Sequence, residues 1–283
     1  MVSLIYGSTY SIAKGIMPDL IGPSGFILLR VAVAAFLFFS FHRAFVREKV
    51  TDRKDFVQLF IAGFFGVATN MLFFFNGLAF TNELNASVLM LNAPVFVLGF
   101  SALLLKEKPH KWQIAGVLIS AVGAVLLIGG SALEFDSRTA QGDLMIVINA
   151  ISYAFYLVYV KPLLQKYSAA TITRWTFAFG VLIVLPFGMP ELMAVDFGSF
   201  SPRAWASLAF VAIATTFFAY FLNAWAVQKA SPVLVGSYIY LQPVIATVIA
   251  QFLGKEVLSF ERVIFAMLIC TGVYLVGKFK RRT

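Results

Sequence analysis

Long apolar runs separated by short polar stretches make up most of the chain. An α-helix rises about 1.5 Å per residue, so a run of roughly 20 residues spans the hydrocarbon core of a bilayer. The pattern therefore predicts ten membrane-spanning helices, at residues 1–17, 24–41, 56–78, 86–105, 112–130, 144–164, 171–189, 205–227, 232–253 and 263–277. The first run is short for a span, so either its helix is tilted with thin ends or the chain begins further upstream.

Two parts of the chain repeat one pattern. Twice, a Pro-Val pair lies early in an apolar helix and a Lys-Glu pair follows, with the glutamate 13 residues after the proline. The first copy runs from Pro94 to Glu107 and the second from Pro243 to Glu256. A second motif agrees in its internal spacing: Thr69, Phe73 and Asn76 match Thr216, Tyr220 and Asn223. Such self-similarity indicates a duplicated unit.

We interpret the chain as two five-helix repeats, residues 1–130 and 143–283, joined by a connector at residues 131–142. Because five is an odd number, the second repeat enters the membrane from the opposite side. The predicted fold is therefore an all-α integral membrane protein, with ten transmembrane helices arranged as two inverted five-helix repeats. Secondary transporters often have this plan, with a site between the repeats.

The positions of Lys and Arg predict the orientation. Basic residues crowd the loops after spans 2, 4, 6 and 8 and the C-terminal tail. The loops on the other side hold only Arg138, Arg203, Lys255 and Arg262. Basic loops stay in the cytoplasm, so the N- and C-termini are both predicted to be cytoplasmic.

Composition agrees with a membrane protein. Of 283 residues, 60% are hydrophobic and 12% are charged, whereas a soluble domain carries about 25% charged residues. The net charge is +9, but the basic residues lie beside spans. The predicted partners are thus the lipid bilayer and a small-molecule substrate, with no nucleic acid. The sequence has no hydrolase, zinc-protease or nucleotide-binding motif, so we predict no enzyme activity, no cofactor and no metal.

Polar residues form a stripe on one helix face in each of two related spans. In the first span the stripe is Ser3, Tyr6, Gly7, Tyr10 and Lys14. In the sixth span it is Asn149, Ser152, Tyr153 and Tyr156. Polar groups are costly inside a bilayer. These stripes either line a shared polar cavity or form hydrogen bonds between packed helices.

Two basic residues inside spans are candidates for substrate contact. Lys14 lies near the outer end of its span, where its side chain either contacts substrate or snorkels to the interface. Arg30 lies about two turns into the second span. Arginine stays charged and so needs water, a carbonyl group or an anion. A cavity-facing Arg30 is the favoured interpretation.

Amide and aromatic side chains complete the predicted substrate site. Asn76 and Asn223 occupy matched positions, either at a shared midplane site or as hydrogen-bonding links between helices. Asn70 on the third span and Gln242 beside a repeated proline belong to the same predicted site. The tyrosines offer faces for stacking on a flat solute, although aromatic residues also line membrane interfaces; those predicted to contact substrate are Tyr6, Tyr10, Tyr153, Tyr156, Tyr220 and Tyr238.

Proline and small residues predict how the helices bend and pack. Pro94 and Pro243 interrupt backbone hydrogen bonds within apolar helices, so they either act as a hinge or gate or produce static kinks. Gly116, Ser120 and Ala124 recur every four residues in the fifth span. They predict tight helix packing within a monomer or in a homodimer.

The positions of the acidic residues give no sign of ion coupling. All 13 Asp and Glu residues lie in loops or at span ends. Proton-coupled carriers often use a carboxylate within the membrane, and the sequence offers none. An uncoupled exchange of substrate is therefore the simplest expectation.

These features together resemble the EamA-type branch of the drug/metabolite transporter superfamily. The resemblance rests on Leu4-Ile5-Tyr6-Gly7-Ser8 through Lys14, Ala86-Ser87 before Pro94-Val95, Gly142-Asp143-Leu144, and the two Lys-Glu motifs. The family commonly has Trp-Gly where this chain has Tyr6-Gly7. The resemblance implies a cavity lined by spans 1–4 and 6–9, and export of amino acids or related metabolites across a bacterial inner (plasma) membrane.

The favoured function is that of an alternating-access exporter of small metabolites, with amino acids, including aromatic ones, as the favoured substrates. Lys14 or Arg30 would meet the substrate carboxylate. An organic-anion or phosphate-ester exchanger, a drug exchanger, a channel-like pore and a non-transporting scaffold are the alternatives. The phosphate-ester alternative would call for more basic residues in the cavity.

Overall fold

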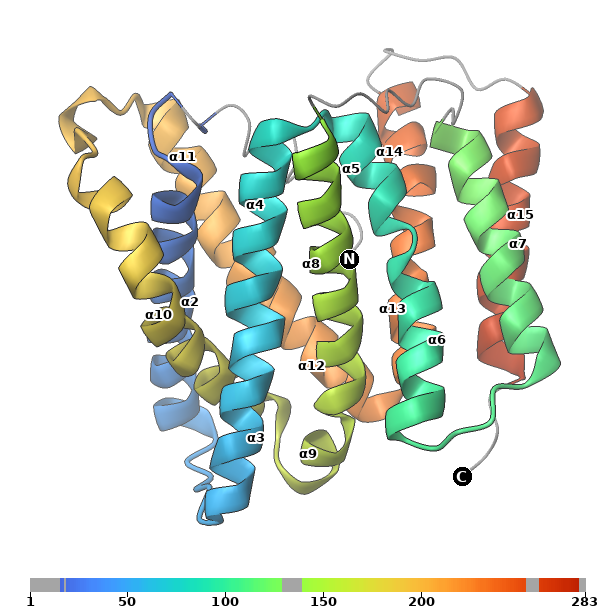
Figure 1. Cartoon of the computed structure of the whole chain (residues 1–283), viewed down its shortest axis with the longest axis horizontal. Helices are drawn as coiled ribbons and strands as arrows, with labels where there is room; N and C mark the ends of the chain where they lie inside the picture. Colours follow the sequence, from blue (N-terminus) through green and yellow to red (C-terminus); the bar gives the residue numbers. More distant parts are fainter. Residues whose placement is uncertain (1–15, 18, 129–138, 253–259, 280–283) are drawn as a thin grey trace.

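The computed structural model describes residues 16–17, 19–128, 139–252 and 260–279. Within these residues helices are the only regular secondary structure. The described residues contain eight helical stretches, some of them made of two or three consecutive helices, that are long and apolar enough to cross a membrane. A shorter apolar stretch, Pro232–Ile245, adds to them. The helices lie side by side in one bundle (Figure 1). The first predicted span, except its last two residues, lies outside the described part of the chain.

The helices that follow are named as in Figure 1. They are α2 (Pro23–Phe45), α3 (Arg53–Gly63), η1 (Phe64–Thr69), α4 (Asn70–Phe80), α5 (Glu83–Met90), α6 (Ala93–Leu104), α7 (Lys111–Ile128), α8 (Ala140–Tyr159), α9 (Lys161–Lys166), α10 (Ala169–Met193), η3 (Phe197–Ser199), α11 (Pro202–Phe210), η4 (Val211–Phe218), α12 (Ala219–Lys229), α13 (Pro232–Ser237), η5 (Tyr238–Tyr240), α14 (Leu241–Phe252) and α15 (Phe260–Lys278). Helices α3, η1 and α4 form one span, as do α11, η4 and α12.

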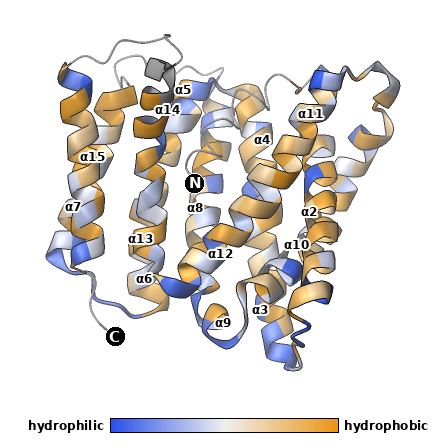
Figure 2. Cartoon of the chain, turned by 180° about the vertical axis from the view of Figure 1, so that it is seen from behind, coloured by the Kyte–Doolittle hydropathy of each residue, from blue (hydrophilic) through white to orange (hydrophobic). Residues whose placement is uncertain are grey.

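Helix starts follow local sequence. Ser168, Ser201 and Ser231 precede α10, α11 and α13, and each hydroxyl accepts a hydrogen bond from a backbone N–H of the first turn. Asp52 does the same for α3. Such caps satisfy backbone donors that have no partner within the helix. Figure 2 shows hydrophobic residues along the helices and hydrophilic residues concentrated near their ends.

Helices α2 and α10 run antiparallel near one edge of the bundle and pack closely along each other (Figure 1). The N-terminus of each helix binds a carboxylate that lies at, or just beyond, the C-terminal end of the other. Gly25 N at the start of α2 donates to Glu191 Oε2 at 2.9 Å, and Ser168 N before α10 donates to Glu48 Oε2 at 3.0 Å. Negative charge at a helix N-terminus is favourable because it complements the helix dipole. Both ends of the pair are therefore clamped.

The clamp at Glu48 predicts a stability loss in acid. Burial raises the pKa of this carboxyl, but hydrogen bonds from Thr171 and Ser168 outweigh burial and hold the pKa below its usual value of 4.5. A lowered pKa adds stability above pH about 4.5 that disappears as the pH falls below it. We expect Glu48→Gln to lower the free energy of unfolding at pH 7 by about 1 kcal/mol, as for a lost helix cap.

Thermal unfolding in detergent between pH 7 and pH 3.5 would measure this effect. The difference between the parent protein and Glu48→Gln should shrink as the pH falls, because the parent carboxylate then becomes protonated. Glu107→Gln, which changes an exposed glutamate on the same predicted membrane side, is the control. An unchanged difference across the whole pH range would contradict the assignment.

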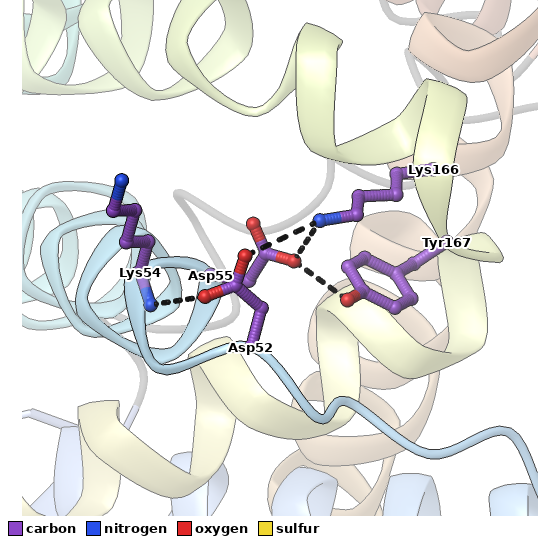
Figure 3. Close-up of polar contacts among 5 residues, drawn as sticks. All are labelled: Asp52, Lys54, Asp55, Lys166 and Tyr167. Carbon is purple, nitrogen blue, oxygen red and sulfur yellow. Dashed lines mark hydrogen bonds and ion pairs between the residues drawn. The ribbon is translucent and has the colours of Figure 1, made fainter.

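A second polar cluster joins α3 to α9 (Figure 3). Tyr167 Oη donates to Asp55 Oδ2 at 2.6 Å, and Lys166 forms an ion pair with the same oxygen. Asp52 Oδ1 accepts from Lys54 N at 2.9 Å. The acidic groups here are matched by donors, so the cluster fastens loops on the side predicted to face the cytoplasm.

Helices α7 and α15 pack against each other at the other edge of the bundle (Figures 1 and 2). Gly116 and Gly272 lie at their contact, where a Cβ added to Gly272 would be 2.4 Å from Gly116 O. Ser120 Oγ donates to Ile269 O at 3.2 Å. The tight packing predicted for the small-residue stripe is thus confirmed, and it occurs within one chain.

Candidate binding cavity

Two spans contain a segment of π-helix, η1 in the third predicted span and η4 in the eighth. A π-helix has a wider turn than an α-helix and is often found at functional sites. The extra residue releases backbone carbonyls for other partners. Phe65 O in η1 accepts from Ser152 Oγ at 2.6 Å. Val211 O at the start of η4 accepts from the hydroxyls of Thr215 and Thr216, at 2.7 and 2.8 Å.

Two further spans are broken near their middle. A turn at Leu91 and Asn92 separates α5 from α6, and the short 3-10 helix η5 separates α13 from α14. The breaks lie directly before the two repeated prolines. Pro94 occupies the first turn of α6, where its missing N–H costs no hydrogen bond. Pro243 is the third residue of α14. Movement at Pro94 and Pro243 stays a prediction.

The broken and π-helical spans surround a cavity of about 90 Å³. Its walls come from α2, α4, α5, α8, α12, η5 and α14. Polar and apolar groups both contribute; the lining residues are Arg30, Asn70, Met71, Phe74, Phe75, Met90, Asn149, Tyr153, Tyr220, Ile239 and Gln242. Arg30, Asn70, Asn149, Tyr153, Tyr220 and Gln242 belong to the site predicted from sequence. We call this space the central cavity.

Arg30 is held at the wall of the central cavity by neutral groups of other helices. Its Nε donates to Thr216 Oγ1 at 2.8 Å, and its Nη2 donates to Thr215 Oγ1 at 3.3 Å. The guanidinium carbon lies 4.6 Å from the centroid of the Phe75 ring, a cation–π contact. The two hydroxyls donate onward to Val211 O. The π-helix thus directs two successive threonines at one cation.

Amide and phenol groups form another part of the wall. Tyr220 Oη donates to Asn70 Oδ1 at 2.9 Å, and Asn149 Nδ2 donates to Asn70 O at 2.6 Å. Asn223 Nδ2 donates to Tyr153 Oη at 3.3 Å. Among the described residues, the buried Asn149 Oδ1 has no hydrogen-bond partner. A buried acceptor without a donor costs free energy, so this oxygen suits a donor from a ligand.

Comparison with known proteins identifies the chain. The family model of the EamA-like transporter family matches residues 1–129 and again residues 140–278. The chain belongs to the EamA-like transporter family. It is therefore a multi-pass membrane transporter, and this class of function argues against an enzyme.

Relatives of this EamA transporter support the assignment. An uncharacterized transporter of Archaeoglobus fulgidus is 30% identical over 78% of this chain and 76% of the relative. The uncharacterized transporter YoaV of Bacillus subtilis is 25% identical over 99% of this chain and 96% of the relative. A protein of known crystal structure has the same fold, with a TM-score of 0.76 at 19% identity over 99% and 96% of the two chains.

Other residues of the predicted site lie outside the walls of the central cavity. Asn76 Nδ2 donates to Ser24 Oγ at 3.3 Å and to Leu72 O, which is the helix-linking alternative. Tyr156 is buried with its ring against Gly66. Asn223 supports Tyr153 from behind the wall. Tyr238 is 43% exposed. Tyr6, Tyr10 and Lys14 lie outside the described residues.

Sequence reasoning missed several lining and supporting groups of the EamA cavity. Met71, Phe74, Phe75, Met90 and Ile239 are apolar residues in apolar helices, so no sequence signal separates them from lipid-facing neighbours. Thr215 precedes Thr216, which the repeated motif did indicate. In a regular α-helix successive side chains diverge by about 100°, and the pattern did not reveal that a π-turn brings both hydroxyls to Arg30.

Proposed function

We propose that this EamA transporter exports small zwitterionic metabolites, above all amino acids including aromatic ones, by alternating access. One observation carries the proposal: the central cavity combines the charged Arg30 with the buried acceptor Asn149 Oδ1. A carboxylate complements the guanidinium, and an ammonium group supplies the donor that the amide oxygen lacks. The rings of Phe74 and Phe75 and the two cavity tyrosines would contact an apolar or aromatic side chain.

The charge of the central cavity favours an amino acid over a phosphate ester. Among the described residues that line it, Arg30 alone is charged. A single cation matches one carboxylate, whereas a phosphate ester carries nearly two negative charges. The organic-anion and phosphate-ester alternatives therefore rank below a zwitterion.

We also propose the ten-helix arrangement of two inverted repeats. Two pairs of local features support it. A π-helical segment occurs in each of the third and eighth spans, near the matched Thr69 and Thr216. A helix break precedes each of Pro94 and Pro243. Helix ends and breaks that recur in related positions are expected of a duplicated unit whose copies share a backbone plan.

Alternating access requires a contact that opens and closes on one side of the site. Helices α6 and α13 pack together, and Val97 lies at Gly236, where an added Cβ would be 3.1 Å from Val97 Cγ2. We propose this contact as the cytoplasmic gate. The proposal places both termini in the cytoplasm and the protein in a bacterial inner membrane; a 25% identical relative from Salmonella typhimurium is named an uncharacterized inner membrane transporter.

Counterflow in proteoliposomes tests the function. Vesicles containing the purified protein would be loaded with a mixture of unlabelled amino acids and then offered each labelled amino acid, with and without a proton gradient. We expect saturable uptake that depends on internal amino acid and needs no gradient. Protein-free vesicles are the control.

Two results would contradict the proposal. The absence of uptake for every amino acid, with folded protein confirmed by size-exclusion chromatography, would reject this substrate class. Uptake that neither saturates nor responds to internal amino acid would indicate a channel-like pore instead of alternating access.

A further inference from the structure

A second and larger cavity is lined by residues of α6, α7, α9 and α13 and of the loop that joins α6 to α7. Figure 1 shows α9 and this loop at the same end of the bundle, which is the end that carries the basic loops. Its volume is about 690 Å³. The α6–α13 contact at Val97 and Gly236 involves two of these helices, closer to their inner ends. We call the larger space the vestibule. It is separate from the central cavity, because the two share no lining residue.

Basic side chains dominate the charge of the vestibule. Lys106, Lys108 and Lys161 line it together with one carboxylate, Glu107. Lys161 Nζ already donates to Val227 O at 2.7 Å and to two other carbonyls at the end of α12, where a cation complements the helix dipole. Lys106 and Lys108 are exposed, and their charges act on the vestibule itself.

Lys106 lies in the turn that ends α6 and has a strained backbone. Lys106 has φ 54°, in the left-handed region, and Glu107 N donates to Ser101 O at 3.3 Å to close the turn after α6. Glycine is the usual residue at this point of such a turn. A side chain there is strained, because its Cβ lies close to the following carbonyl oxygen. Arg47 follows α2 with a left-handed φ of 53° as well, so this geometry alone marks no site. Lys106 contributes its charge to the vestibule.

The wall of the vestibule also contains a buried hydroxyl that suits a ligand. Ser101 is 2% exposed, and in the described part of the chain its Oγ has no hydrogen-bond partner. A hydroxyl donor complements a carboxylate or phosphate oxygen. The cations and this hydroxyl therefore act on the same kind of group.

We propose that the vestibule is an anion-binding site that receives a carboxylate or phosphate group on the cytoplasmic side. A soluble metabolite and an anionic lipid headgroup share this chemistry. The role of the site as an entrance for substrate rests on the proposed function. The binding of an anion does not, and it can be measured without transport.

A charge-selective labelling experiment tests the anion site. The one native cysteine, Cys270, is exposed and would be replaced by serine. Gln165, an exposed lining residue, would then become cysteine as the reporter, and Thr51→Cys would serve as a reference outside the vestibule. The rates of reaction with the cysteine thiol would be compared for two methanethiosulfonate reagents, the anionic MTSES and the cationic MTSET.

We expect MTSES to react faster than MTSET at the vestibule, after correction for their rates with free cysteine. Lys108→Gln should lower the MTSES rate at Gln165→Cys by roughly threefold, because it removes one positive charge whose attraction solvent and salt partly screen. Glu107→Gln should raise it, and high salt should remove both effects. The MTSES rate at the reference Thr51→Cys should change with neither of these substitutions. The proposal would be overturned if MTSES and MTSET reacted at equal corrected rates at the vestibule and if neither substitution nor salt changed those rates.

Protection of the reporter separates the two sources of the anion. Inorganic phosphate would be added to protein in nanodiscs of phosphatidylcholine, and a second set of nanodiscs would contain phosphatidylglycerol. Slower MTSES labelling with phosphate indicates a soluble anion, and slower labelling only with phosphatidylglycerol indicates a headgroup. Labelling that neither anion slows would count against a binding site.

Lys106→Gly distinguishes a binding role from a structural one. Glycine removes the strain of the left-handed residue, so the melting temperature should rise while the MTSES rate falls. A variant that melts lower and labels at the parent rate would show that Lys106 is only structural. Because labelling needs no substrate, failed counterflow with positive labelling would reject the transport proposal alone.

Discussion

Arg30→Ala is expected to abolish amino-acid counterflow while the protein remains folded. The guanidinium is buried at the central cavity and is the charge that the proposed substrate carboxylate would meet. Hydrogen bonds to a charged group contribute about 1.5–3 kcal/mol, so substrate affinity should fall by one to two orders of magnitude, and uptake measured below the parent KM should fall close to background. Thr215 and Thr216 keep their bonds to Val211 O in the variant, and this limits the damage to folding.

Matched variants separate the charge of Arg30 from its placement. Arg30→Lys keeps the charge but replaces the rigid, planar fork of the guanidinium with a compact ammonium group, so we expect residual flux with a raised KM. Thr216→Val removes the 2.8 Å hydrogen bond to Nε and should shift KM in the same direction, with rescue by Thr216→Ser. Full flux in folded Arg30→Ala would refute the role. If that variant does not fold, the other variants carry the test.

Gly272→Val is expected to lower the free energy of unfolding more than any of the other substitutions considered. An added Cβ at Gly272 would lie 2.2 Å from Ser120 Oγ and 2.4 Å from Gly116 O, and a backbone oxygen cannot turn aside as the end of a flexible side chain can. Lipid tails are as apolar as side chains, so close packing holds membrane helices together. Overpacking commonly costs 1–3 kcal/mol. With contacts this close, we expect about 3 kcal/mol, a drop in melting temperature of roughly 10 °C.

Gly99→Ala is the matched control for this prediction. Nothing lies within 4 Å of a Cβ added at Gly99 in α6, and alanine favours helix over glycine by up to about 1 kcal/mol. We expect an unchanged or higher melting temperature. Thermal size-exclusion assays of both variants in detergent would measure the difference. Equal melting temperatures would show that the α7–α15 contact does not hold the fold together.

Gly272→Val also bears on the division between site and scaffold. Helices α7 and α15 contribute no described residue to the central cavity. The protein that remains folded should therefore keep its substrate affinity, whereas Arg30→Ala should lose affinity and keep its stability. The two variants are expected to fail in opposite ways.

The identity of the site shows where sequence reasoning reached its limit. Polar groups are rare and costly in apolar spans. This criterion points to six residues that the folded chain brings to one cavity: Arg30, Asn70, Asn149, Tyr153, Tyr220 and Gln242. That these residues bind substrate remains a prediction. Asn70 and Asn76 look alike by that criterion. Yet Asn70 lines the cavity, whereas Asn76 links α4 to Ser24 of α2.

By itself, the sequence determined the membrane class, the position of each described span and the duplicated motifs, because the length of an apolar run and the spacing of residues are local properties. Tertiary structure alone decided which polar groups meet. The π-turn at η4 places Thr215 and Thr216 on Arg30, and the breaks before Pro94 and Pro243 shape the cavity between helices. The physical reason is that a helix face acquires its meaning only from the neighbours packed against it.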